Sequence, residues 1–146
     1  MKFIYKGIGL ISILFIVASC SFSKKQIVSK AEANDSCKIE VVVLDPGHFH
    51  ASLLQKETLT DVSDTIRIYA PEGIAVNQYL ESIDSYNQRA ESPTTWKKQV
   101  YTGDDYLQKM LADHKGNIAV LAGNNQKKTR YIMESIKAGY HVLADK

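Results

Sequence analysis

Two patterns of apolar residues alternate along the chain from residue 39 onward. Short, continuous apolar runs predict β-strands that are buried on both faces, whereas apolar residues that recur every three or four positions predict helices with one apolar side. Strands are expected over 39–44, 65–70, 98–101, 117–122 and 141–144, and helices over 73–87, around 106–111 and over 126–138. This alternation with short connections predicts a doubly wound α/β domain with a parallel sheet and right-handed crossovers.

The expected helices have recognisable apolar faces and ends. The faces consist of Val76, Tyr79, Leu80 and Ile83 in the first helix, of Tyr106, Leu107, Met110 and Leu111 in the second, and of Tyr131, Ile132, Ser135 and Ile136 in the third. Thr102 or Asp104 is expected to cap the second helix, because both side chains accept hydrogen bonds from backbone N–H groups. Gly139 is expected to end the third helix, since glycine readily adopts the left-handed conformation common at that position.

The first twenty residues differ from the rest of the chain. Lys2 and Lys6 precede an apolar run over 8–18 that contains no acidic residue, which is typical of a signal peptide. The run is shorter than the ~20 residues that a transmembrane helix needs. It ends in Ala18-Ser19-Cys20, which resembles a lipobox, so we expect cleavage before Cys20 and attachment of lipid to that cysteine. A plain secretory signal with an incidental cysteine is the alternative.

A lipidated Cys20 sets the expected organisation and location of the protein. Residues 1–20 are then a lipoprotein signal peptide, 21–37 a polar, flexible tether and 38–146 the folded domain. Two or more acyl chains hold a protein stably at a bilayer. The expected location is therefore extracytoplasmic, anchored through lipid to a bacterial membrane and facing the periplasm.

Charge and cysteine content exclude two further classes of protein. The chain has 18 basic and 16 acidic residues, and residues 1–20 contain two of the basic ones and none of the acidic ones, so the remainder carries 16 of each. A formal charge of about zero does not favour nucleic acid as a partner. Once Cys20 is acylated, Cys37 is the remaining thiol, and no intramolecular disulfide is expected.

Ligands of open parallel sheets bind beyond the carboxyl ends of the strands. The first such position holds Asp45-Pro46-Gly47-His48-Phe49-His50, where a dinucleotide-binding protein carries G-x-G-x-x-G. Gly47 matches the second glycine, which lets backbone approach the pyrophosphate. Asp45 and His50 replace the other two glycines, and Asp45 is expected to bring a carboxylate close to the phosphates.

His48 and His50 also form an H-x-H pair that could bind a metal ion. Residues two apart on a helix do not share a face, and the sequence shows no obvious cluster of acidic residues or cysteines to complete a set of ligands. We therefore expect no metal, and assign both histidines a capping or packing role.

Polar residues follow the other expected strands as well. Glu72 lies 25 positions after Gly47, near the spacing at which an acid accepts hydrogen bonds from the adenosine ribose; it is equally suited to the first turn of a helix. Asn124 and Asn125 follow the fourth strand, where they can line the crevice or cap the next helix. Asp145-Lys146 follows the fifth strand.

Residues 117–146, together with the preceding βαβ order, resemble the Gfo/Idh/MocA family of oxidoreductases, whose members contain a strand, a T-P-N-type turn, a helix, an A-G-K-H-V strand and an E-K-P motif. Secreted, lipidated members from Bacteroidetes with a P-G-H-F-H-A-type first loop are the relatives it resembles most. The chain departs from the family in keeping one glycine of three and in having Asp145 where the motif has glutamate.

The resemblance implies a Rossmann-like domain that binds NAD or NADP, with NAD slightly favoured because Arg67 lies within a strand and offers no clear site for a 2′-phosphate. It implies that Lys146 is catalytic, contacting cofactor and substrate, and that Asn124 and Asn125 lie beside the nicotinamide ribose. The full set of residues expected to bind the cofactor is Gly47, His48, Phe49, Glu72, Asn124, Asn125 and Asp145.

The expected function is that of the N-terminal cofactor-binding part of an NAD(P)-dependent oxidoreductase acting on a sugar-like substrate outside the cytoplasm. Two alternatives remain: a non-catalytic binding lipoprotein with a degenerate dinucleotide fold, and part of a redox-neutral glycoside hydrolase that uses NAD. We expect the chain to stop before a substrate domain, and the sheet to be incomplete at its carboxyl-terminal end. Residues 21–146 alone are expected to aggregate or stay partly unfolded, and homo-oligomers are a further possible partner.

Overall fold

The computed structural model describes residues 38–145. Cleavage and lipidation at Cys20, the tether over 21–37 and the catalytic role of Lys146 lie outside these residues and stay predictions. Within the described part, no helix is both long enough and apolar enough to cross a bilayer.

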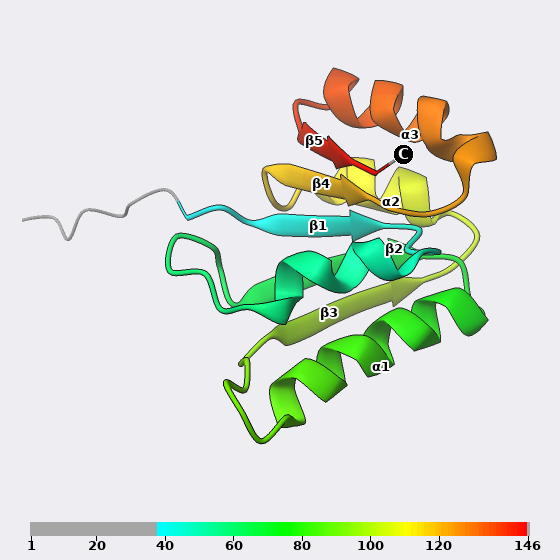
Figure 1. Cartoon of the computed structure of the whole chain (residues 1–146). Helices are drawn as coiled ribbons and strands as arrows, with labels where there is room; N and C mark the ends of the chain where they lie inside the picture. Colours follow the sequence, from blue (N-terminus) through cyan, green and yellow to red (C-terminus); the bar gives the residue numbers. More distant parts are fainter. Residues whose placement is uncertain (1–37, 146) are drawn as a thin grey trace, which may run out of the picture. The chain divides into compact units, whose positions relative to one another are not determined.

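A five-stranded, all-parallel sheet forms the centre of the domain (Figure 1). Its strands are β1 (Val41–Leu44), β2 (Thr65–Ala70), β3 (Lys97–Thr102), β4 (Ile118–Leu121) and β5 (His141–Ala144). The order across the sheet is β3-β2-β1-β4-β5, so the chain builds outward from β1 in one direction and then returns to add β4 and β5 on the other side. This confirms the predicted doubly wound α/β fold, and every strand begins and ends within two residues of its expected position.

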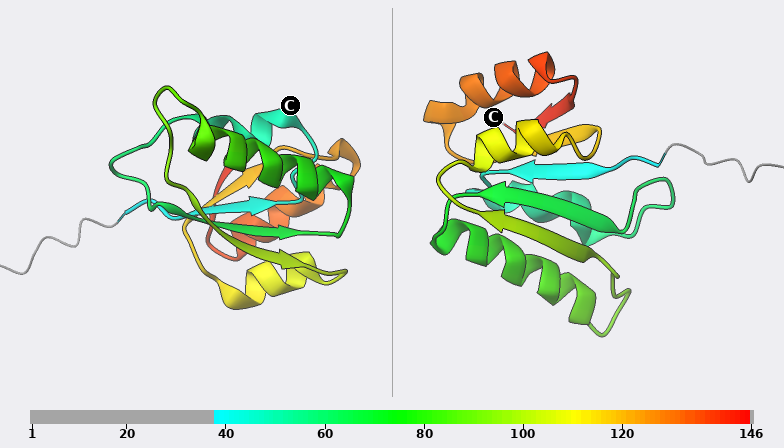
Figure 2. Two further views of the ribbon diagram at one scale, coloured as in Figure 1. Left: turned by 90° about the horizontal axis from the view of Figure 1, so that it is seen from below. Right: turned by 180° about the vertical axis from the view of Figure 1, so that it is seen from behind.

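Helices cover both faces of the sheet. They are the 3₁₀-helix η1 (Phe49–Lys56) and the α-helices α1 (Ile74–Gln88), α2 (Tyr106–Asp113) and α3 (Asn125–Lys137). Residues of η1 and α1 pack with one set of strand side chains, and residues of α2 and α3 pack with the other set. Figure 2 shows η1 and α1 on one face of the sheet and α2 on the opposite face.

The burial of β1 explains why its sequence is continuously apolar. Successive strand residues point to opposite faces, and Val41 and Val43 belong to the core under η1 and α1, whereas Val42 and Leu44 belong to the core under α2 and α3. All four are at most 1% exposed. The outer strand β3 is by contrast mostly exposed, and its apolar residue Val100 is 44% exposed.

One helix end follows expectation and another does not. Gly139 adopts a positive φ of 88° just after α3, as predicted. The capping residue of α2 is Asp105 and not Thr102 or Asp104, and it makes no side-chain cap, because its carboxylate accepts a hydrogen bond from the Tyr101 hydroxyl at 2.5 Å.

The expected apolar face of α3 is narrower in the structure. Tyr131 and Ser135 are buried, but Ile136 is 58% exposed. The helix η1 was not expected either, because its buried residues are Ala51, Ser52 and Gln55, which do not form an apolar repeat.

Candidate functional site

The loops that follow β1 and β4 meet at the point where the chain reverses its direction across the sheet. The two strands are adjacent, but η1 follows β1 on one face and α3 follows β4 on the other. Such a switch point is where open α/β sheets bind ligands. The loops are joined by two hydrogen bonds, from the N–H groups of Gly47 and His48 to the carbonyl oxygen of Ala122, at 3.0 and 3.1 Å.

Gly123 makes this close crossing of the two loops possible. A Cβ atom at Gly123 would lie 2.1 Å from the backbone oxygen of Asp45, closer than any van der Waals contact allows. Sequence analysis did not single out Gly123. The available signal was a glycine directly after a buried strand, because glycine there marks a close approach of another backbone segment.

Asp45 adopts the backbone conformation that the first glycine of a dinucleotide loop would otherwise supply. Its φ is 48°, in the left-handed region that aspartate tolerates better than most residues. Its carboxylate accepts a hydrogen bond from the hydroxyl of Tyr131 at 2.6 Å and lies 3.8 Å from the ammonium of Lys127. The Asp45 carboxylate, which was expected beside the phosphates, is therefore turned toward α3. The Asp45 side chain is only 13% exposed.

The Asp45 carboxylate is part of a polar network between α2 and α3. The Tyr131 hydroxyl is also hydrogen-bonded to the hydroxyl of Tyr106, which accepts a hydrogen bond from Lys127 at 3.1 Å. Burial, followed by the hydrogen bond to Asp45, raises the pKa of Tyr131 far above its ordinary value. The hydrogen bond to Tyr106 raises the pKa of Lys127 as well. The Asp45 carboxylate thus lies beside a protonated phenol and a lysine ammonium group.

His48, His50 and Asp145 converge beside this crossing. The Nδ1 atom of His50 lies 2.7 Å from Oδ2 of Asp145, and the Nδ1 atom of His48 lies 3.5 Å from the same oxygen. Asp145 follows β5 and is held by hydrogen bonds from its N–H to Leu121 and from Lys128 to its carbonyl oxygen. Sequence analysis found no partner for the two histidines because Asp145 lies 95 residues from His50.

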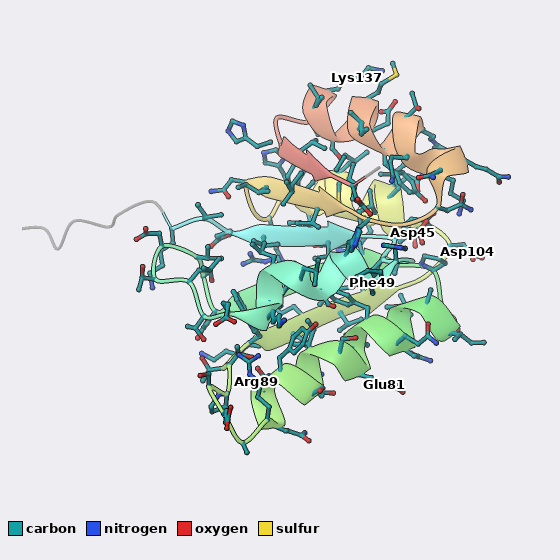
Figure 3. All side chains as sticks on the ribbon, in the orientation of Figure 1. Asp45, Phe49, Glu81, Arg89, Asp104 and Lys137 are labelled. Carbon is teal, nitrogen blue, oxygen red and sulfur yellow. The ribbon has the colours of Figure 1, made fainter. Side chains whose placement is uncertain are left out.

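The other predicted site residues occupy three places. Phe49 is the first residue of η1 and is 66% exposed, and its ring contacts both histidine rings, at centroid distances of 4.5 Å to His48 and 4.2 Å to His50. In Figure 3, Phe49, Asp45 and Asp104 lie on the same side of the molecule, toward which the strands point. Asn124 is the N-cap of α3 and accepts a hydrogen bond from the N–H of Gln126 at 2.8 Å, as one of its expected roles requires.

Asn125 and Glu72 are both exposed, and only one of them is near the crossing. Asn125 is the first residue of α3, directly after Asn124. Glu72 follows β2, on the far side of β1 from β4. The structure therefore brings Gly47, His48, Phe49, Asn124 and Asp145 to the carboxyl ends of β1, β4 and β5, and leaves Glu72 on a separate loop.

Two grooves border the first loop. One, of about 250 Å³, lies between that loop and α1 and is lined by Pro46, Gly47, His48, Phe49, Ser52, Ala75, Gln78, Tyr79 and Ser82. The other, of about 440 Å³, is mostly apolar and is lined by His50, Leu53, Leu54, Val120, Ala122, Leu143, Ala144 and Asp145. The loop after β1 is a wall of the first groove only, whereas the second lies against η1 through His50, Leu53 and Leu54.

Comparison with known proteins yields one informative similarity. No family model and no curated protein matches the chain. A crystal structure from Parabacteroides merdae ATCC 43184, of a protein provisionally named an oxidoreductase, is 52% identical over 75% of this chain, with a TM-score of 0.74. The match covers 25% of that protein, so the chain spans about a quarter of the length of this relative.

Proposed function

We propose that the chain is the dinucleotide-binding part of an NAD(P)-dependent oxidoreductase of the Gfo/Idh/MocA type, acting on a sugar-like substrate. The observation that carries the proposal is the crossing of the loops after β1 and β4, which places Gly47 and the beginning of α3 at the switch point of the sheet. The 52% identity with a protein provisionally named an oxidoreductase supports the same class of activity.

Three features of the first loop suit a dinucleotide. Gly47 is exposed and has no side chain, so the backbone can approach a bound phosphate closely. Asp45 is turned away toward Tyr131, which keeps its carboxylate out of the loop. The N-terminus of α3, with the positive end of its helix dipole, lies beside the loop and favours an anionic group.

Within such a site, the nicotinamide ring would accept a hydride from the substrate or, in its reduced form, donate one to it, and the protein residues would bind and orient the cofactor. Gly47, His48 and Phe49 would hold the pyrophosphate side, Asn124 and Asn125 the nicotinamide ribose, and Glu72 the adenosine ribose. Asp145 would contact the cofactor, and Lys146 would contact both cofactor and substrate as the catalytic residue.

One observation favours a second candidate, a binding lipoprotein without redox activity. The N–H groups of Gly47 and His48, which would donate to a pyrophosphate in a glycine-rich loop, donate to Ala122 instead. The pyrophosphate of a bound dinucleotide would therefore have to accept hydrogen bonds from other N–H groups, or the two hydrogen bonds to Ala122 would have to break. A protein that has kept the fold and lost the cofactor would show the same arrangement.

Native mass spectrometry of the full-length protein, extracted from its source membranes, separates these candidates. We expect an acylated chain that starts at Cys20 and carries one NAD or NADP. We also expect Gly47→Val to abolish dinucleotide binding measured by calorimetry, because its Cβ would lie 3.4 Å from Gly123 and 3.7 Å from the backbone nitrogen of Asn124, so a branched side chain crowds the beginning of α3. Gly103→Ala, directly after β3, is expected to leave binding unchanged.

Each contrary result selects another candidate. An acylated chain without dinucleotide, which also binds none on addition, supports the binding lipoprotein. A folded Gly47→Val variant that holds NAD(P) as tightly as the parent contradicts the placement of the cofactor at this loop.

A further inference from the structure

The proposed dinucleotide site includes His48 and Asp145, but it does not explain why these two side chains and His50 converge on one point. One potential ligand atom from each residue lies within 4.8 Å of the others. The Nδ1 atom of His50 lies 2.7 Å from the Asp145 carboxylate oxygen and that of His48 lies 3.5 Å from the same oxygen, while His48 Nδ1 also accepts a long hydrogen bond of 3.4 Å from the backbone N–H of His50. The three side chains therefore already surround one small volume.

The local backbone explains how two histidines only two positions apart share a side. His48 is the N-cap of η1 and has an extended backbone, with φ −136° and ψ 146°, whereas His50 lies within the helix. The rule that helical residues two apart face different directions therefore does not apply to this pair. Their ring centroids are 4.3 Å apart.

The three groups are typical ligands of a borderline divalent metal ion. Zinc binds imidazole nitrogen and carboxylate oxygen at about 2.0–2.2 Å, and two histidines with one carboxylate are a known set of three ligands that leaves a fourth position open. In a tetrahedral site these bond lengths place ligand atoms about 3.3 Å apart. The two imidazole-to-carboxylate separations of 2.7 and 3.5 Å lie on either side of that value, and all three ligand atoms lie within 4.8 Å of one another, so rotation of the three side chains can bring them to one ion.

The site is also accessible and partly fixed. The side chains of His48, His50 and Asp145 are 46%, 31% and 21% exposed, so an ion can enter from solvent. The backbone of Asp145 is held by its hydrogen bonds to Leu121 and Lys128. His50 and Asp145 form the polar part of the otherwise apolar groove beside β5.

We propose that His48, His50 and Asp145 bind one divalent transition-metal ion of the zinc class through two imidazole nitrogens and a carboxylate oxygen. At least one coordination position remains for water or for an oxygen atom of a small molecule in the adjacent groove. The proposal does not depend on dinucleotide binding, and it is tested without any dinucleotide present.

The test uses the full-length protein without a histidine tag, in a Cys37→Ser background, because a thiolate binds zinc tightly. After removal of metal with a chelator, Zn²⁺ is titrated by calorimetry and Co²⁺ by its visible absorption. We expect one ion per chain, an increase in melting temperature on binding, and a Co²⁺ spectrum typical of four-coordinate nitrogen and oxygen ligation.

Substitution of each ligand identifies the site. His48→Gln, His50→Gln and Asp145→Asn are each expected to weaken Zn²⁺ binding at least about tenfold, given that even loss of a group that only orients a ligand typically costs 10- to 100-fold. The matched control is His141→Gln, since His141 is an exposed histidine on β5 outside the cluster. It is expected to leave the affinity unchanged.

A second measurement uses the unsubstituted protein, so it tests the site even if the variants fail to fold. In nuclear magnetic resonance spectra of histidine rings labelled with ¹⁵N, Zn²⁺ should shift the signals of His48 and His50 and leave those of His114 and His141 in place. Absence of Zn²⁺ and Co²⁺ binding at millimolar concentration, or shifts confined to His114 or His141, would overturn the proposal.

Discussion

The hydroxyl of Tyr131 on α3 donates a hydrogen bond of 2.6 Å to the carboxylate of Asp45, the residue that ends β1 in a left-handed conformation. The two residues are 86 positions apart and join the loop at the switch point to the helix that follows β4. This hydrogen bond orients the Asp45 side chain so that its carboxylate lies 3.8 Å from the Lys127 ammonium group. The stability of the crossing therefore depends on residues outside the loops themselves.

Replacing Tyr131 by phenylalanine should lower the free energy of unfolding by about 1.5–3 kcal/mol, the usual contribution of a hydrogen bond to a charged group. The loss arises because a largely buried carboxylate keeps its charge and loses a donor. Urea unfolding at neutral pH measures it. In a double-mutant cycle with Asp45→Asn, the two losses should be clearly non-additive, and additive losses would show that the contact contributes nothing.

Gly123→Ala should destabilise the domain by about 1–3 kcal/mol or more, the range for overpacked sites, because its Cβ would meet the Asp45 oxygen at 2.1 Å. Gly47→Ala is the matched control. Its Cβ would meet Gly123 at an ordinary 3.4 Å, and Gly47 has no positive φ. Urea midpoints measure both variants, and equal midpoints would contradict the crossing described above.

Gln55→Met should stabilise the protein by about 1 kcal/mol. Gln55 is 0% exposed, and within residues 38–145 neither its amide nitrogen nor its amide oxygen has a hydrogen-bond partner. A buried polar group without a partner costs about 1–3 kcal/mol, and the backbone oxygen that accepts from Trp96 is unaffected. Thermal melts measure the change. Gln99→Met, on the exposed strand β3, serves as control and should stay within about 0.5 kcal/mol.

Stability should fall when the pH rises above about 10. Burial raises the pKa of Tyr69, Tyr79 and Tyr131 above the ordinary value of 10.0. These phenols hold their protons more tightly in the folded state than in the unfolded state. Their contribution to the free energy of unfolding is therefore fully present below pH 10, and it is lost as the pH rises toward their folded-state pKa values.

Urea unfolding between about pH 8 and pH 12 measures this decline, with phenolate absorbance as a second signal. Tyr79→Phe should make the decline shallower, because Tyr79 is nearly inaccessible and cannot ionise without unfolding. A slope identical to that of the parent would mean that Tyr79 is solvated at high pH.

The sequence sufficed to predict the strands and their order of alternation, because those properties depend on local periodicity. The run over Val41–Leu44 is apolar throughout since the strand is buried on both faces. The position of Gly47 after it followed from the rule that ligands bind at strand ends. Both inferences use residues that are neighbours in the chain.

The site itself depends on contacts that the sequence does not display. Asp145 meets His50 only because the residues that follow β5 and β1 come together beyond the end of β4, the strand between them. Asp45 meets Tyr131 only because α3 packs on the opposite face of the sheet from η1. The helix η1, which brings His48 and His50 together, has eight residues and no clear repeat. These features required the tertiary structure.

The crossing at Gly123 also bears on how such a domain could be redesigned. The loops after β1 and β4 share two hydrogen bonds and leave no room for a side chain at Gly123. A library that randomises one loop while keeping the other would therefore mostly yield chains in which the two no longer fit. The two loops should therefore be grafted together, with Asp45 and Tyr131, because the contacts between them keep both backbones in their observed conformation.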